Sequence, residues 1–160
     1  MNRYEDATQE LNTVFNRVVE ERFPIHCGTK FKLLFDTKKR MKQGKITLAT
    51  IETTNDKTRF LTSTDLTPEG FDYIVIVDKL AWDTAQAEDR VRLLSHELCH
   101  AFIDEKGKYK ILDHDIQDFL AEIKRNEDNP DWGVKLAALV SAMYEQKSDQ
   151  ESTNQWQAHS

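Results

Sequence analysis

Apolar residues recur at helical spacing near the beginning of the chain. The pattern i, i+3, i+4, i+7, i+8 is formed by Leu11, Val14, Phe15, Val18 and Val19. This spacing places the five side chains on one face and predicts an amphipathic helix over residues 5–21. Proline disfavours helical backbone in the residue before it, so the helix should end at Phe23, before Pro24.

Three shorter apolar segments predict strands. Residues 31–35 and 46–51 are separated by the polar segment 37–44, which contains a glycine near its end and predicts a hairpin loop. Residues 71–77 contain the run Tyr-Ile-Val-Ile-Val, which is typical of a buried strand. The polar residues 55–67 predict turns between these strands.

Helical spacing returns in the second half of the chain. A long amphipathic helix is predicted over residues 87–104, followed by a short extended piece over 108–112. Asp113 is a suitable N-cap for a helix that runs from His114 to about residue 125. A last helix is predicted to open at residues 129–131, where Asn-Pro-Asp precedes further apolar positions.

This order of elements predicts an α+β fold with a small, mainly antiparallel sheet packed on helices. Residues 1–147 are expected to form a single domain, because a chain of this length closes one hydrophobic core. The tail 148–160 is rich in Gln, Ser and Asn and is predicted to be disordered.

Composition narrows the functional classes. Apolar residues make up 39% of the chain, yet no run is long enough for a transmembrane helix, and the polar N-terminus predicts no signal peptide. Two cysteines do not make a disulfide framework, so we expect a cytoplasmic protein, in the host cell if it is phage-encoded.

The charge is unevenly distributed along the chain. The net charge of −6 argues against a general nucleic-acid-binding surface, but residues 29–59 carry nine basic against three acidic side chains. Five basic residues cluster in the predicted hairpin: Lys38, Lys39, Arg40, Lys42 and Lys45. A DNA contact through this segment is one interpretation, and a solvated, aggregation-resistant hairpin is the favoured one.

The segment His96-Glu97-Leu98-Cys99-His100 carries the strongest chemical signal. Spacing i, i+4 on a helix puts the imidazoles of His96 and His100 on one face, where they can hold one zinc ion. Glu97 lies about 100° round the helix, beside the metal, where it can act as general base. Cys99 points away from His100 and is predicted to be a small buried hydrophobe.

A catalytic zinc site needs a third protein ligand and an open position. His114 is the favoured candidate, because the intervening chain can leave the zinc helix, turn at Gly107 and return. Glu122 and Asp118 are the rival ligands. The acids that could orient the imidazoles are Asp113, Asp115 and Asp118.

The segments FDYIVIVDKLAW, RVRLLSHELCHAF and LDHDIQDF together resemble the phage metallopeptidase family over residues 71–119. The His-x-x-x-Phe at His114 is also similar to the third-ligand segment of SprT-like metalloproteases. The resemblance implies a zincin-like domain in which His96, His100 and His114 bind Zn²⁺ and Glu97 is the catalytic acid/base. Two features depart from the SprT-like pattern: there is no Cys-rich zinc ribbon, and Asp115 stands where some members have Gly.

The leading hypothesis is a zinc-dependent metallopeptidase, a hydrolase that acts on a protein or peptide substrate. A sheet edge can align an extended substrate through its backbone, and residues 71–77 are the predicted edge strand. The alternative is a non-catalytic, zinc-stabilised module that binds protein or DNA. A fourth protein ligand such as Cys99 or Glu122 would favour that alternative by closing the coordination.

Overall fold

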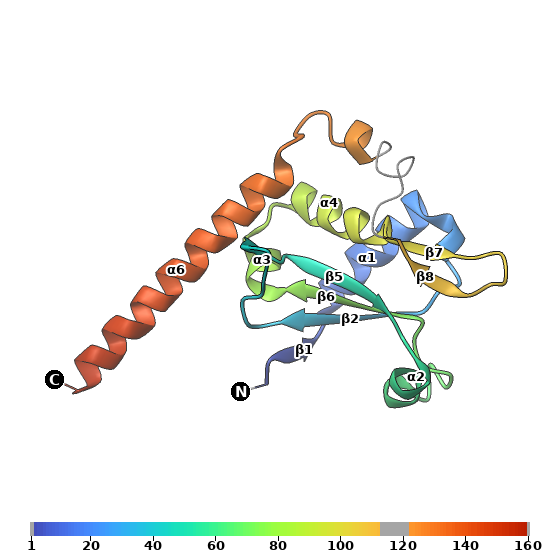
Figure 1. Ribbon diagram of the computed structural model, residues 1–160, viewed down its shortest axis with the longest axis horizontal. Helices are drawn as coiled ribbons and strands as arrows, with labels where there is room; N and C mark the ends of the chain where they lie inside the picture. The colour runs from blue at the N-terminus through green and yellow to red at the C-terminus, as the bar shows by residue number, and fades with distance from the viewer. Residues whose placement is uncertain (1, 113–121, 160) are drawn as a thin grey trace.

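The computed structural model describes residues 2–112 and 122–159, and its largest sheet has four strands in the order β1-β2-β6-β5. The strands are β1 (Tyr4–Asp6), β2 (Phe31–Asp36), β5 (Ala49–Thr53) and β6 (Tyr73–Asp78). β2 and β6 are parallel, whereas β1 pairs with β2 and β5 pairs with β6 in antiparallel fashion. The α+β class with a small, mainly antiparallel sheet is therefore confirmed (Figure 1).

The strand pairing differs from the prediction in two ways. β2 and β5 both pair with β6, so the predicted hairpin that joins them directly is wrong. The segment between them forms its own hairpin, β3 (Met41–Lys42) and β4 (Lys45–Ile46), whose turn residues have positive φ, as a type I′ turn requires. β6 lies inside the sheet, so the prediction that residues 71–77 form an edge strand is also wrong; the edge strands are β1 and β5.

Helices pack on one face of this sheet and flank it (Figure 1). They are α1 (Gln9–Arg22), α2 (Asp56–Thr62), α3 (Lys79–Thr84), α4 (Ala87–Leu98) and α6 (Trp132–His159), with the 3₁₀ turn η1 (Pro24–His26) after α1. Residues 122–125 are helical as well. The short helices α2 and α3 were not predicted, since each depends on a local cap: Asn55 and Thr58 form a capping box for α2, and Asp78 accepts from the Ala81 N–H in α3.

The main core lies between the sheet and the helices α1 and α4. Alternate residues of the strands point to the same side and meet the apolar stripes of both helices. The fully buried members include Leu11, Phe15, Phe35, Val75, Val77, Leu94 and Leu98. The predicted N-terminal helix is confirmed, but it begins at Gln9 rather than at residue 5, because Thr8 caps it by accepting from the Leu11 N–H.

The predicted helix over 87–104 ends at Leu98, six residues early. The following residues form the hairpin of β7 (Ala101–Ile103) and β8 (Tyr109–Ile111), which fits their β-branched and aromatic content. The hydroxyl of Tyr73, a fully buried residue, lies 3.0 Å from the Phe102 carbonyl oxygen and 2.9 Å from that of Lys110. These contacts tie the hairpin to the central strand β6, and Gly107 provides the positive φ that its turn requires.

α6 continues through residues 148–159, where the sequence predicts a disordered tail. Its first turns pack on α3, with Leu136 and Val140 buried against Ala81 and Ala85. The polar second half extends away from the body (Figure 1), and its Glu, Gln and Lys residues have high helix propensity. Within the described residues no helix is both long and apolar enough to cross a membrane.

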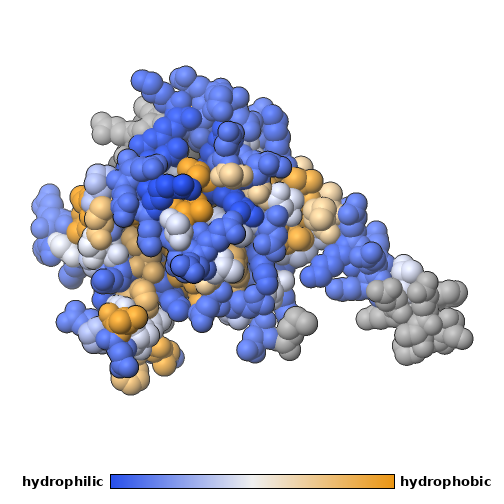
Figure 2. Space-filling model, turned by 180° about the vertical axis from the view of Figure 1, so that it is seen from behind, coloured by the Kyte–Doolittle hydropathy of each residue, from blue (hydrophilic) through white to orange (hydrophobic). Residues whose placement is uncertain are grey.

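The surface is mostly hydrophilic (Figure 2). Apolar atoms gather on the projecting segment that holds α2, where Phe60, Leu61 and Leu66 are exposed. The four lysines of the basic segment 38–45 are exposed as well, as a solvated hairpin requires. Arg40 differs from them: its guanidinium bonds to the buried carboxylate of Asp36 at 2.9 Å and to the Thr50 hydroxyl at 3.2 Å.

Candidate metal centre

His96 and His100 lie side by side at the C-terminal end of α4. The centroids of their imidazole rings are 5.2 Å apart, and the ring planes meet at 85°. His96 is in the last turn of the helix and His100 follows two residues after its end. The last turn tightens there, since the His100 N–H donates to the Glu97 carbonyl at 3.1 Å. The i, i+4 spacing therefore brings the two rings together, as the sequence predicts, although the helix stops between them.

The His100 ring is held in one orientation by Leu112. The Leu112 carbonyl oxygen lies 2.7 Å from Nδ1 of His100, and the Leu112 N–H donates to the His100 carbonyl at 2.6 Å. A carbonyl oxygen only accepts, so Nδ1 must carry the hydrogen and the lone pair lies on Nε2. Metal-binding histidines are oriented by a hydrogen bond of this kind, which also fixes the nitrogen that faces the metal.

Glu97 is buried beside the two histidines, with 7% of its surface exposed. Burial penalises the charged carboxylate and raises the pKa of Glu97 to about 8, while the positive charge of Arg40 acts in the opposite direction. A cation bound next to Glu97 would lower this pKa, because a nearby positive charge favours the carboxylate. Arg40 was not among the predicted site residues, since within a lysine-rich segment nothing distinguishes it in the sequence.

Trp132, the first residue of α6, flanks the other side of His96. The indole and imidazole centroids are 6.5 Å apart, and the indole also packs against both core clusters. In the sequence Trp132 shows only as an apolar position of the last helix. One turn before His96 on α4, Arg92 donates to Asp128 at 2.8 Å. The chain before α6 is therefore fastened along the helix that carries the histidines.

Glu122 contacts a neighbouring face of α4. Its buried side chain accepts hydrogen bonds through Oε1 from the Ser95 hydroxyl and, at 3.4 Å, from the Cys99 thiol. Oε2 is buried without a hydrogen-bond partner among the described residues. Cys99 is partly exposed, so its prediction as a buried hydrophobe is wrong; Glu122 gives its thiol a polar partner.

The remaining predicted site residues lie outside the described part of the chain. His114, the expected third ligand, is one of them, and the others are Asp113, Asp115 and Asp118. Across 2–112 and 122–159 no group of three or more His, Cys, Asp or Glu side chains could hold a metal ion. His26 stands apart from the site: it is buried and bonds to the Ala101 carbonyl oxygen and the Thr29 hydroxyl, each at 3.1 Å.

The donor set at the end of α4 fits a transition metal. Two adjacent imidazoles, one of them with a fixed tautomer, match the nitrogen ligands that zinc prefers, and a buried carboxylate next to them can move a proton. An α+β domain that presents His-Glu-x-x-His in this way is typical of metal-dependent peptidases.

Comparison with known families agrees with this class. A family model described as "Putative phage metallopeptidase" matches residues 2–145, and the chain belongs to that family. Its name indicates a hydrolase that cleaves peptide bonds and requires a metal ion. No curated protein and no solved structure gives a significant match to the chain.

Proposed function

We propose that the protein is a zinc-dependent peptidase in which His96, His100 and His114 bind Zn²⁺ and Glu97 acts as general base and acid. The observation that carries this proposal is the pairing of His96 and His100 with the hydrogen bond from His100 to Leu112. That bond presents Nε2 of His100 as the metal-binding nitrogen before any metal arrives, so less ordering is needed on binding.

Chain connectivity supports His114 as the third ligand. Leu112 is bonded to His100 through both its N–H and its carbonyl oxygen. Two residues of extended chain span at most about 7 Å, so the chain length after Leu112 permits His114 to reach the histidine pair. Glu122, the rival, already accepts from Ser95 and Cys99, which occupy a neighbouring face of α4.

In the proposed hydrolysis the metal ion would polarise the reacting groups, and Glu97 would transfer the proton. A zinc ion in this site would supply Lewis-acid polarisation of the peptide carbonyl and of a water molecule. The Glu97 carboxylate takes a proton from the attacking water and then gives it to the nitrogen of the leaving amine. Burial of Glu97 keeps this proton away from bulk solvent between the two steps.

The substrate class follows from the edge of the sheet. β5 is one of the two edge strands and packs against α4, the helix that holds His96 and Glu97. An extended peptide can add to such an edge through backbone hydrogen bonds with little side-chain selectivity. We therefore propose unfolded protein or peptide segments as substrates, in the cytoplasm of a phage-infected host cell.

Metal analysis and casein hydrolysis with matched variants test this proposal. The parent should hold one zinc per chain, and Glu97→Gln should keep the zinc yet lose activity by at least about 100-fold, the usual scale of general acid–base catalysis. His159→Ala changes a histidine that is not among the proposed ligands and should behave like the parent. Hydrolysis by Glu97→Gln at the parent rate would refute the mechanism. A folded, zinc-loaded parent without activity would favour the non-catalytic binding module.

A further inference from the structure

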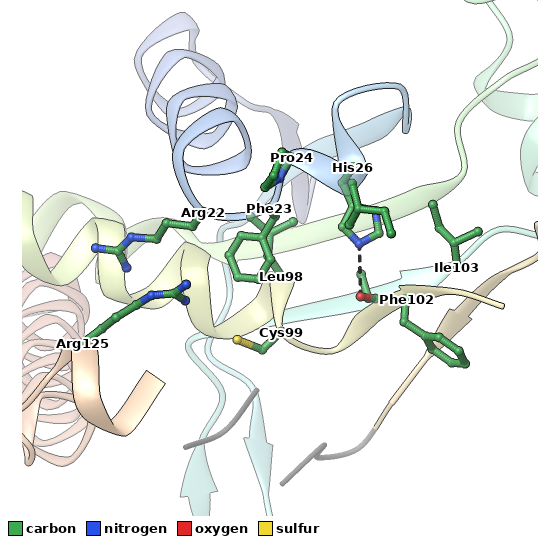
Figure 3. A pocket seen from close by; sticks show the side chains of 11 residues that line it. Arg22, Phe23, Pro24, His26, Leu98, Cys99, Phe102, Ile103 and Arg125 are labelled. Atoms are coloured by element: carbon green, nitrogen blue, oxygen red, sulfur yellow. Dashed lines mark hydrogen bonds between the residues drawn. The ribbon is translucent and has the colours of Figure 1, made fainter. Parts of the chain in front are cut away.

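A cavity of about 500 Å³ lies between the end of α1, η1, β7 and the end of α4 (Figure 3). Its apolar walls include Phe23, Pro24, Leu98, Phe102 and Ile103. α4 contributes Leu98 and Cys99 to this cavity but neither histidine of the candidate metal centre. The size and the largely apolar wall are those of a small-molecule site.

Two arginines give the cavity a cationic end. Figure 3 draws Arg22 and Arg125 at one end, with Phe102 and Ile103 at the other. Nη1 of Arg22 is buried and has no hydrogen-bond partner among the described residues. A buried donor without an acceptor is unfavourable, so an acceptor oxygen brought within reach of this guanidinium would be stabilised. Arg125 lies over the ring of Phe23, with 5.8 Å between the guanidinium carbon and the ring centroid.

The charges of the described side chains at the arginine end of the cavity favour a ligand with one negative charge. The Glu122 carboxylate is 3.9 Å from Arg125 and offsets one of the two positive charges. Among these three described side chains one net positive charge remains, which suits a carboxylate better than the nearly doubly charged phosphate monoester. The planar guanidinium fork also matches the two oxygens of a carboxylate. Among the described residues that line the other end, His26 is the polar side chain, and it already bonds to the Ala101 carbonyl (Figure 3).

We propose that this cavity binds a small carboxylate whose body is apolar, such as an aromatic ring on a short chain. The carboxylate lies between Arg22 and Arg125, and the apolar body packs on Phe23, Leu98 and Ile103. This site uses none of the proposed metal ligands, and its proposal does not rest on the proposed peptidase activity.

The probe for the test is 4-phenylbutyrate, with the uncharged 4-phenyl-1-butanol as its matched control. A ligand-observed NMR titration of the full chain should give a Kd of about 1 mM, as expected for an anion of this size. The alcohol should bind at least tenfold more weakly. Arg22→Gln should weaken 4-phenylbutyrate binding at least fivefold, whereas Arg17→Gln, which changes an exposed arginine of the same helix, should leave it unchanged.

The alkylation rates of the two cysteines show whether the ligand binds in this cavity. Cys99 lines the cavity, whereas Cys27 is exposed and serves as an internal reference. At 10 mM 4-phenylbutyrate, alkylation of Cys99 by iodoacetamide should slow about tenfold, as expected for a Kd near 1 mM, while Cys27 reacts at an unchanged rate. If Arg22→Gln does not fold, Arg125→Gln provides the same comparison from the more exposed arginine. Equal binding of the acid and the alcohol, or no binding of the acid in the titration, would overturn the proposal.

Discussion

Replacement of Glu122 by alanine separates the stability of the fold from the identity of the third metal ligand. Glu122 is 4% exposed, and its carboxylate accepts from Ser95 and Cys99. Hydrogen bonds to a charged acceptor contribute about 1.5–3 kcal/mol each, with the thiol at or below the lower end. The buried, unpartnered Oε2 costs about 1–3 kcal/mol in the parent and disappears with the side chain. We therefore expect Glu122→Ala to lower the free energy of unfolding by about 1–3 kcal/mol.

The same variant should change zinc binding much less. A competitive chelator titration of the folded protein should show a loss of affinity below tenfold for Glu122→Ala. His114→Ala should lose more than tenfold, because removal of a ligand costs more than loss of support for the helix that carries the ligands. Urea unfolding in excess chelator measures stability alone, and Glu122→Gln, which keeps an acceptor oxygen, should recover part of it. The reverse order of zinc affinities would identify a His–His–Glu site and refute the assignment of His114.

Three further outcomes follow from the structure. His96→Ala should lose most of its zinc by elemental analysis, and the affinity of the parent should fall below about pH 6, because only the unprotonated imidazole binds metal. Burial lowers the pKa of His26 from its usual 6.5. The stability that neutral His26 contributes is therefore present above pH 6.5 and is lost as the pH falls through the lower pKa of the folded state. Urea unfolding should show a smaller decrease in the free energy of unfolding between pH 7 and pH 5 for His26→Gln than for the parent. Gly70→Ala should lower the free energy of unfolding by about 2 kcal/mol or more, because Gly70 has φ +76° and a Cβ there would lie 2.0 Å from the Arg59 carbonyl oxygen. Gly28→Ala is the control, since a Cβ at position 28 would have no atom within 4 Å.

The sequence predicted elements whose periodicity is local and long. The apolar stripe of α1 and the β-branched run of β6 were recognised, because each reports burial on a face that the element itself defines. Strand pairing depends on contacts between distant residues, so the parallel pairing of β2 with β6 could not be inferred from the spacing within either strand. The prediction of a hairpin failed for this reason: chain proximity favoured β5 as the partner of β2, while the sheet places β6 between them.

In the candidate metal centre, too, the sequence predicted the residues whose spacing is local and missed those that come from distant parts of the chain. His96 and His100 were predicted to lie on one face, one turn apart, and their ring centroids are 5.2 Å apart, because four residues make about one helical turn. Trp132 packs beside His96, and the charge of Arg40 acts on Glu97; both lie outside the motif, and only the tertiary fold brings them near it. The helix was predicted to continue past His100 because Ala101 and Phe102 fit its apolar stripe. In the folded protein Ala101 and Phe102 instead belong to strand β7 of the hairpin β7–β8, where Ala101 pairs with Ile111.

The early end of α4 has a consequence for how the centre is held. A continuous helix would position His100 by itself, but here its ring depends on Leu112, which the hairpin brings back to it. Residues beyond the hairpin then contact α4 at Ser95 through Glu122 and at Arg92 through Asp128. Three separate contacts, from Leu112, Glu122 and Asp128, thus hold α4 and the residues that follow it. Metal binding at His96 and His100 should therefore be thermodynamically coupled to these three contacts, so that loss of either weakens the other by the same free energy.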